Sequence, residues 1–227
     1  MQLEAKALDR ILSSMPLFSG LAPECLAALA GSTRMLSFGR GETVFRKGDQ
    51  ADGFYYVFDG KVKLFFVSER GTEKVVEILT PGLTFGEAVM FIDKPYPVFA
   101  ETLADSHLLY IQRDGLLEAM QHYEQMGPRL LAGLSRRLHD LVTAMEAVCV
   151  LSSRERVIGY LLAEIERSGG DSIELPATKV AVASMLNLTP ETFSRILHGL
   201  EKEGLLTIER RTIRALDLGR LREYAAC

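Results

Sequence analysis

Residues 188–200 read LTPETFSRILHGL and decide the fold of the C-terminal part of the chain. Thr189 is a favourable N-cap and Pro190 suits the first helical position, so these two residues predict the start of a helix. Apolar side chains then recur at helical spacing and predict a buried stripe: Phe193, Ile196, Leu197 and Leu200. Polar side chains recur at i, i+3, i+4 and i+7 on the opposite face: Glu191, Ser194, Arg195 and His198.

A polar helix face of this kind has two interpretations. Most surface helices turn charged residues outward for solvation only. The alternative is a reader of the DNA major groove, in which a planar Arg forks onto guanine, a carboxylate accepts from a base amine, and a hydroxyl serves either role. The flanking sequence decides between the two.

The flanks predict a winged helix-turn-helix. Upstream, residues 178–186 read as a short capped helix, and Asn187 follows where a left-handed residue could turn the chain. Downstream, Gly204 ends the second helix, and residues 205–208 and 212–216 read as two strands joined by a basic turn. This order of helix, turn, helix and hairpin favours the DNA interpretation.

The residues also carry a family resemblance. Glu-Thr-Phe-Ser-Arg at 191–195, with Leu188 before it and Gly-Leu-Leu at 204–206 after it, resembles the recognition helix of the CRP/FNR superfamily of bacterial transcription regulators. The Glu, Ser, Arg trio is similar to the fumarate-nitrate regulator (FNR) branch, which reads a TTGAT-type half-site. A DNA-binding regulator that recruits or blocks RNA polymerase is therefore expected, and not an enzyme.

The resemblance implies roles for five residues of the helix, and the basic turn suggests a further role for the wing. Three residues are expected to read bases: Glu191 an amine, Ser194 a thymine and Arg195 a guanine. Four residues are expected to hold backbone phosphate from the helix and the wing: Thr189, Thr192, Arg210 and Arg211.

Length and charge set further limits. At 227 residues the chain exceeds the usual size of one domain, so two domains are expected. The formal charge of −4 is unfavourable for a nucleic-acid partner, but residues 178–214 hold six basic and four acidic residues, a net charge of +2. Specific contacts made by a dimer must therefore supply more of the affinity than a broad basic surface does.

The sequence predicts a cytoplasmic protein. No apolar run approaches the roughly 20 residues that span a bilayer, so no membrane partner is expected, and the N-terminus shows no secretory signal. Cys25, Cys149 and Cys227 are far apart and lack metal-ligand spacing, so they are interpreted as structural thiols. The clustered N-terminal cysteines that hold the iron–sulfur cluster of FNR are missing, so such a cluster is not expected.

The first half of the chain predicts an antiparallel jelly roll. Short β-branched and aromatic runs at 43–45, 54–58, 62–67 and 75–79 alternate with glycines. Residues 41–48, 54–57, 60–63 and 85–87 resemble the cyclic-nucleotide-binding β-roll of the same superfamily. The expected effector pocket consists of Gly86, Glu87, Val98 and Phe99.

The sequence departs from the nucleotide-binding pattern at the phosphate. In family members that bind cyclic nucleotides, Gly-Glu grips the ribose and an Arg about ten residues later neutralises the phosphate. Here Glu87 is present, but no Arg or Lys occurs between Lys94 and Arg113. A buried phosphate without a cation is costly, so tight binding of cyclic AMP or cyclic GMP is not expected.

Residues 88–95 and 191–198 resemble the dissimilatory nitrate respiration regulators (Dnr), which are associated with haem and nitric oxide. Haem is therefore the cofactor that the resemblance suggests, with no metal site of the protein's own. Any of four histidines could be the axial ligand: His107, His122, His139 and His198.

A long helix is expected to begin at Pro128. Its apolar residues follow spacings of 3 and 4 and form a coiled-coil seam: Leu131, Leu134, Leu138, Leu141, Met145 and Val148. The seam favours a parallel homodimer on a palindromic operator, with two recognition helices in successive major grooves of double-stranded DNA. The alternative is that the same stripe packs onto the chain's own roll.

The expected fold class is α+β with three parts. Residues 1–126 form the effector-sensing roll with an N-terminal helix, 127–151 the dimerisation helix, and 152–227 the winged helix-turn-helix. Two alternatives remain open. The first is a cyclic-nucleotide-responsive regulatory module that controls a partner. The second is a cupin-like metalloenzyme, which would need a facial set of histidines and a carboxylate.

Overall fold

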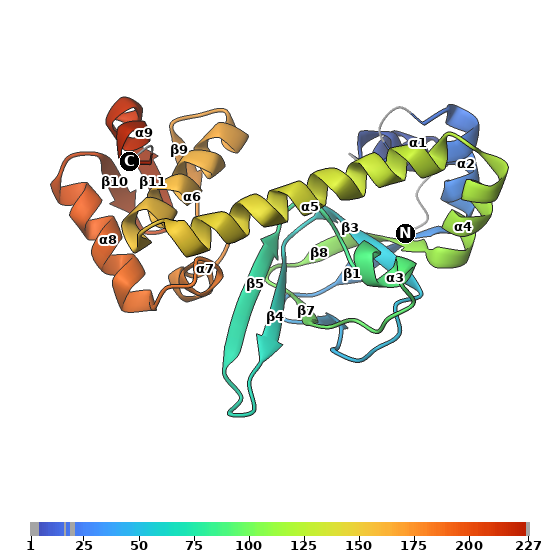
Figure 1. Ribbon diagram of the computed structural model, residues 1–227, viewed down its shortest axis with the longest axis horizontal. Coiled ribbons are helices and arrows are strands. Elements are labelled where there is room, and N and C mark those ends of the chain that lie inside the picture. The colour runs from blue at the N-terminus through green and yellow to red at the C-terminus, as the bar shows by residue number, and fades with distance from the viewer. Residues whose placement is uncertain (1–4, 16, 19–20, 226–227) are drawn as a thin grey trace. The chain divides into compact units, whose positions relative to one another are not determined.

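The computed structural model describes residues 5–15, 17–18 and 21–225, without the side chains of 5–7, 137, 140, 144, 146–150 and 225. The chain divides into two compact units, residues 1–73 with 77–140, and residues 74–76 with 141–227. An antiparallel β domain, a long helix and a helix-turn-helix domain with a small sheet follow one another along the chain (Figure 1). This order confirms the predicted α+β fold class.

The first unit contains two four-stranded sheets, with strand orders β1-β8-β3-β6 and β2-β7-β4-β5, and Figure 1 shows β4 beside β5. The strands are β1 (Thr33–Phe38), β2 (Thr43–Phe45), β3 (Gly53–Asp59), β4 (Val62–Val67), β5 (Glu73–Leu79), β6 (Thr84–Phe85), β7 (Phe99–Thr102) and β8 (Ser106–Gln112). The helices before, among and after them are α1 (Ala5–Ser14), α2 (Pro23–Gly31), α3 (Glu87–Phe91) and α4 (Arg113–His122).

Close backbone packing explains one of the roll's glycines. Gly60 joins β3 to β4 with φ +90°, a left-handed conformation that favours glycine. A Cβ at this position would lie 2.1 Å from the Ser106 Oγ, so no side chain fits. The strands and the helices share one apolar core, whose fully buried members include Phe54, Val57, Leu108, Leu109 and Ile111.

The long helix α5 (Met126–Val150) begins two residues before Pro128, the residue at which the sequence suggested a helix start. Pro128 instead lies within the first turn, where its missing N–H costs no helical hydrogen bond. Met126 and Leu130 are buried in the core of the first unit, which explains the earlier start.

Among the described residues, the second unit contains the end of α5, four further helices and a three-stranded sheet of order β10-β11-β9. Its elements are α6 (Ser153–Ser168), β9 (Ser172–Glu174), α7 (Lys179–Met185), α8 (Pro190–Lys202), β10 (Leu206–Glu209), β11 (Thr212–Ala215) and α9 (Leu218–Ala225). Strand β9 and helix α9 were not predicted from the sequence. The hairpin of β10 and β11 is the predicted wing, within one residue at its edges.

Local capping groups set the helix starts of this unit. Ser152 and Glu155 form a reciprocal capping box at the start of α6. The Thr178 side chain accepts from the Ala181 N–H at the start of α7, as predicted. Asn187 lies between α7 and α8 with φ +57°, the left-handed turn that the sequence suggested.

Candidate nucleic-acid interface and effector pocket

Helix α8 separates its apolar and polar side chains onto two faces. Phe193 and Leu197 are fully buried in the core of the second unit. Glu191 and Arg195 are exposed, and Ser194 is half-buried between them. Because positions i, i+3 and i+4 are neighbours on a helix surface, the structure brings the three expected base-reading residues together on one open face.

The threonines at the start of α8 form a local hydrogen-bonded pair. The Thr189 Oγ1 accepts from the Thr192 N–H at 3.2 Å, which caps the helix. The Thr189 hydroxyl also lies 3.0 Å from the Thr192 Oγ1, to which it donates. The Thr192 hydroxyl can therefore still donate its own proton to another acceptor. The Thr189 hydroxyl is already used as the N-cap of α8.

The wing presents its two arginines in different ways. Arg210 is exposed in the β10–β11 turn with φ +57°. Arg211 is exposed too, but its Nη2 donates to the Leu175 carbonyl at 2.8 Å. The Leu175 N–H in turn donates to the Arg211 carbonyl at 2.9 Å. Arg211 therefore fastens the wing to the segment after β9, and Arg210 is the arginine that points its charge outward from the turn.

Two carboxylates that the sequence analysis missed hold α8 in place. Glu203, at the C-terminal cap of α8, binds the Arg154 guanidinium with two hydrogen bonds. Glu201 accepts from the Ile208 N–H of β10 at 3.1 Å. Arg154 is 49 residues from Glu203 in the sequence, so no local sequence pattern predicts this contact.

Tyr96 occupies the roll beside the expected effector pocket. Its ring stacks on Phe45 with centroids 3.7 Å apart, and its hydroxyl donates to the Gly53 carbonyl at 2.7 Å. Gly86 lies directly against this ring, because a Cβ there would be 3.0 Å from the Tyr96 Cε1. Burial, followed by the neighbouring Tyr55, raises the pKa of the Tyr96 hydroxyl well above its ordinary value.

The four expected pocket residues do not share one face. Glu87 is buried, and Val98 is partly buried and packs against the apolar core. Side chains alternate along a strand, so Phe99 lies on the face of β7 opposite the buried Ala100. The Phe99 ring stacks on Phe65 at 5.5 Å between centroids. The structure therefore separates Phe99 from Val98.

Two cations of the roll are already paired with carboxylates. Lys63 is buried and lies 2.7 Å from Glu73 and 3.1 Å from Glu101, counted between Nζ and carboxylate oxygens. Burial works to lower the pKa of Lys63, but hydrogen bonds to these two carboxylates raise it overall. Arg113 pairs with Asp93 at 2.9 Å. Both cations are therefore already paired, and neither is available to bind a phosphate.

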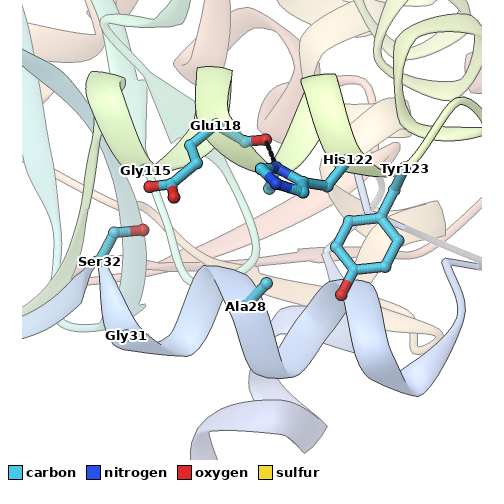
Figure 2. A pocket seen from close by; sticks show the side chains of 8 residues that line it. Ala28, Gly31, Ser32, Gly115, Glu118, His122 and Tyr123 are labelled. Carbon is cyan, nitrogen blue, oxygen red and sulfur yellow. Dashed lines mark hydrogen bonds between the residues drawn. The ribbon is translucent and has the colours of Figure 1, made fainter.

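A surface pocket of about 490 Å³ lies between α2 and α4. Figure 2 shows Glu118, His122 and Tyr123 pointing from α4 and the residue after it toward α2, which carries Ala28. The His122 Nδ1 lies 2.9 Å from the Glu118 carbonyl, to which it must donate because a carbonyl only accepts. The His122 Nε2 is therefore the ring nitrogen left for a ligand.

The remaining three histidines lie elsewhere. His107 is half-buried on β8 with its Nδ1 3.9 Å from Asp59, His139 is exposed on α5, and His198 is exposed on α8. Within the described ranges, no group of three or more His, Cys, Asp or Glu side chains is placed to hold a metal ion. Among those same residues no helix is both long and apolar enough to cross a membrane.

Helix α5 exposes most of its predicted seam. Four of the seam residues are exposed by more than half: Leu131 at 66%, Leu138 at 63%, Leu141 at 52% and Met145 at 69%. Leu134 is half-buried, and the Val148 side chain lies outside the described residues. Val142 adds another exposed apolar side chain to the helix.

Comparison with known proteins assigns both halves of the chain. Residues 35–123 match the cyclic nucleotide-binding domain family, and residues 155–224 match the Crp-like helix-turn-helix domain family. The crystal structure of DNR from Pseudomonas aeruginosa is 34% identical, with a TM-score of 0.56, over 99% of this chain and 100% of that chain.

Two other relatives come from different branches. The cyclic AMP receptor protein of Thermus thermophilus is 28% identical over 94% of this chain and 98% of its own length. The structure of FixK2 from Bradyrhizobium japonicum, at 24% identity, shows the same fold with a TM-score of 0.78 over 86% of this chain and 98% of that chain. Matches to several branches do not single out the FNR or Dnr branch that the sequence analysis favoured.

Proposed function

Because the chain belongs to the CRP/FNR superfamily of transcription regulators, whose members are not enzymes, we propose that it is a homodimeric, effector-controlled regulator of a palindromic operator. The observation that carries the proposal is the open face of α8, on which Glu191, Ser194 and Arg195 lie together. We place its action in the cytoplasm, where it recruits or blocks RNA polymerase at a promoter.

The proposed operator has FNR-like half-sites of the TTGAT type. Arg195 forks onto guanine, Ser194 contacts thymine, and Glu191 accepts from an amine on the partner strand. The phosphates on either side are held by the helix start and the wing, through Thr189, Thr192, Arg210 and Arg211. Thr192 and Arg210 carry more of this role, because Thr189 caps α8 and Arg211 binds Leu175.

The proposed dimer forms along α5. The helix has 25 residues, so its length is about 37 Å, and it exposes an apolar stripe that a second copy of the chain would cover. Residues 1–126 then serve as the effector domain, 127–151 as the dimerisation helix and 152–227 as the DNA-binding domain. A two-fold dimer presents its two α8 helices to major grooves roughly 34 Å apart.

The proposed effector is not an anionic cyclic nucleotide, although one relative carries the name of a cyclic AMP receptor. A cyclic phosphate beside Gly86 and Glu87 needs a cation, but no Arg or Lys occurs in the sequence between Lys94 and Arg113, and Arg113 itself pairs with Asp93. Calorimetric titration with cyclic AMP at neutral pH tests this, and micromolar or tighter binding would overturn it. Such binding would favour the cyclic-nucleotide-responsive alternative.

Haem is a candidate effector, and His122 is the histidine that fits an axial ligand. Its Nδ1 donates to a backbone carbonyl, which is the arrangement that orients metal-binding imidazoles. Haem would supply a site for a diatomic gas at its iron. Adding haem to the purified protein should then shift the Soret band, and His122→Ala should abolish the shift. A shift that survives this substitution removes His122 from the assignment.

Selection from a pool of random DNA duplexes tests the central proposal. The enriched sequences should be inverted repeats, since the proposed dimer is two-fold symmetric, and should contain TTGAT-type half-sites. Selection should be run with and without a small-molecule extract of cells, because the effector is unidentified. If no inverted repeat is enriched in either condition, the assignment as an operator-binding regulator fails.

A further inference from the structure

A single carboxylate connects the recognition helix to the wing and to one more side chain on the open face. The Glu201 Oε1 accepts from the Ile208 N–H of β10 at 3.1 Å. The Glu201 Oε2 lies 3.4 Å from the Nδ1 of His198, whose side chain is 61% exposed. Glu201 therefore holds a backbone donor with one oxygen and an imidazole with the other.

His198 lies on the same face as the expected base-reading residues. It follows Ser194 by four positions and Arg195 by three, so the three side chains are neighbours on the helix surface. An exposed histidine near a carboxylate three residues later can be a solvated pair that contributes little. This pair differs from a solvated pair because Glu201 also accepts from the Ile208 N–H of β10. That second hydrogen bond fixes the position of the carboxylate.

We propose that His198 is a fourth base-reading residue, whose Nε2 accepts from an exposed adenine or cytosine amine, and that Glu201 is the residue that positions it. A carboxylate can only accept, so the Nδ1 of His198 must carry the proton that faces Glu201. The neutral ring then has its lone pair on Nε2. An acceptor on this face matches the amines at adenine N6 and cytosine N4 in the major groove.

The same logic disfavours a phosphate contact for the neutral ring. A phosphate oxygen needs a donor, and Nε2 offers none while Nδ1 holds the proton. The inference rests on the proposed function and adds a base position to it. It predicts that base preference depends on Glu201, a residue that itself touches no DNA.

The test begins with the inverted-repeat duplexes that the wild-type protein selects from a random pool at about pH 8, where an ordinary imidazole is neutral. Binding of His198→Ala to these duplexes, varied one base pair at a time, should show a loss of discrimination of about 3- to 10-fold at one position per half-site. That position should differ from the one that Arg195→Ala relaxes. Arg167→Ala, which removes an exposed side chain of α6 in the same unit, is the matched control and should change no base preference.

Glu201→Gln gives the sharper test, because it reverses the hydrogen-bonding sense of the ring. The amide oxygen must face the Ile208 N–H, so the amide NH₂ faces His198 and moves the imidazole proton to Nε2. The ring should then favour major-groove acceptors, such as guanine O6 and N7 or thymine O4, and should lose its preference for the amine of adenine or cytosine. Thermal unfolding of each variant checks that the fold is retained.

The outcomes separate this inference from the proposed function. If the wild type enriches no duplex, the proposed function fails before His198 is tested. If the wild type binds but His198→Ala discriminates as the wild type does, or weakens all sequences alike, the inference fails while the proposed function stands. A Glu201→Gln variant that keeps the wild-type base preference would also overturn it.

Discussion

Arg154 and Glu203 form a two-pronged ion pair that joins the first turn of α6 to the end of α8. Arg154 Nη1 lies 2.9 Å from Glu203 Oε1, and Nη2 lies 2.5 Å from Oε2. The Arg154 guanidinium also lies 5.0 Å from the centre of the Tyr224 ring in α9. Three helices of the second unit thus meet at one guanidinium, two residues after the end of the segment 151–152 that links α5 to α6.

Arg154→Ala should lower the free energy of unfolding by about 1 kcal/mol. The pair is bidentate, but both side chains are more than one-third exposed, so solvent screens it and a larger loss is not expected. Urea denaturation measures the effect. Arg167→Ala is the matched control, because it removes an exposed i,i+3 pair with Glu164 and should cost only a few tenths of a kcal/mol. Equal losses in the two variants would contradict the role assigned to Arg154.

The same pair predicts an acid dependence of stability. The hydrogen bonds from Arg154 hold the pKa of Glu203 below its ordinary value. The stabilisation is therefore present above the ordinary carboxyl pKa and is lost as the pH falls through the lowered one. Arg154→Ala should flatten this part of the pH profile, and Glu203→Gln should flatten it to the same extent. Profiles that differ from each other would show that another partner controls Glu203.

Arg195→Ala and Arg210→Ala should weaken operator binding in different ways. Loss of Arg195 should remove roughly 1–3 kcal/mol of discrimination at one base position. Loss of Arg210 should weaken binding to all sequences alike and lower the salt slope by about one unit. Fluorescence anisotropy over a salt series separates the two. A uniform loss in Arg195→Ala would reassign that residue to the phosphate backbone.

Leu138→Asp should weaken dimerisation and DNA binding together. Leu138 lies in the exposed apolar stripe of α5, and a carboxylate buried in a seam of two helices has no partner. Analytical ultracentrifugation and operator binding measure the two effects. Arg136→Asp, on the same helix but outside the stripe, is the control and should stay dimeric. Unchanged sedimentation of Leu138→Asp would refute the seam.

Alkaline pH should destabilise the roll. Burial raises the pKa of Tyr55 to about 12, and that of its neighbour Tyr96 is raised further. Each phenol is easier to ionise in the unfolded chain, so the stability is complete below about pH 10 and falls as the pH rises toward 12. Tyr96→Phe should reduce the steepness of this loss, measured by thermal unfolding at a series of pH values. A profile that stays flat up to pH 12 would show that the phenols are solvated.

Much of the second unit could be predicted from local chemistry. Thr189, Pro190 and the apolar period specify α8, because caps and helical spacing are properties of neighbouring residues. Strand β9 could not be predicted in this way, since it has three residues and exists through its pairing with β11. The same holds for the bond of Glu201 to Ile208, which depends on how a helix meets a strand.

The pocket of the roll was less predictable than the DNA-facing helix. The resemblance fixed the positions of Gly86 and Glu87 in sequence, but the side of β7 on which Phe99 lies depends on strand register. The long helix shows the same limit at its start. Met126 is helical because it packs into the core, and that tertiary contact outweighs the local signal at Pro128.

The left-handed residue at the tip of the wing sets two demands against each other. Glycine would adopt the φ of +57° at position 210 without strain, whereas a side chain there costs about 1 kcal/mol. Arg210 therefore places a guanidinium at a hairpin position whose left-handed backbone disfavours any side chain. Selection for thermal stability alone would therefore favour glycine at this position. The more stable variant should bind DNA more weakly, because it would lack the proposed phosphate contact.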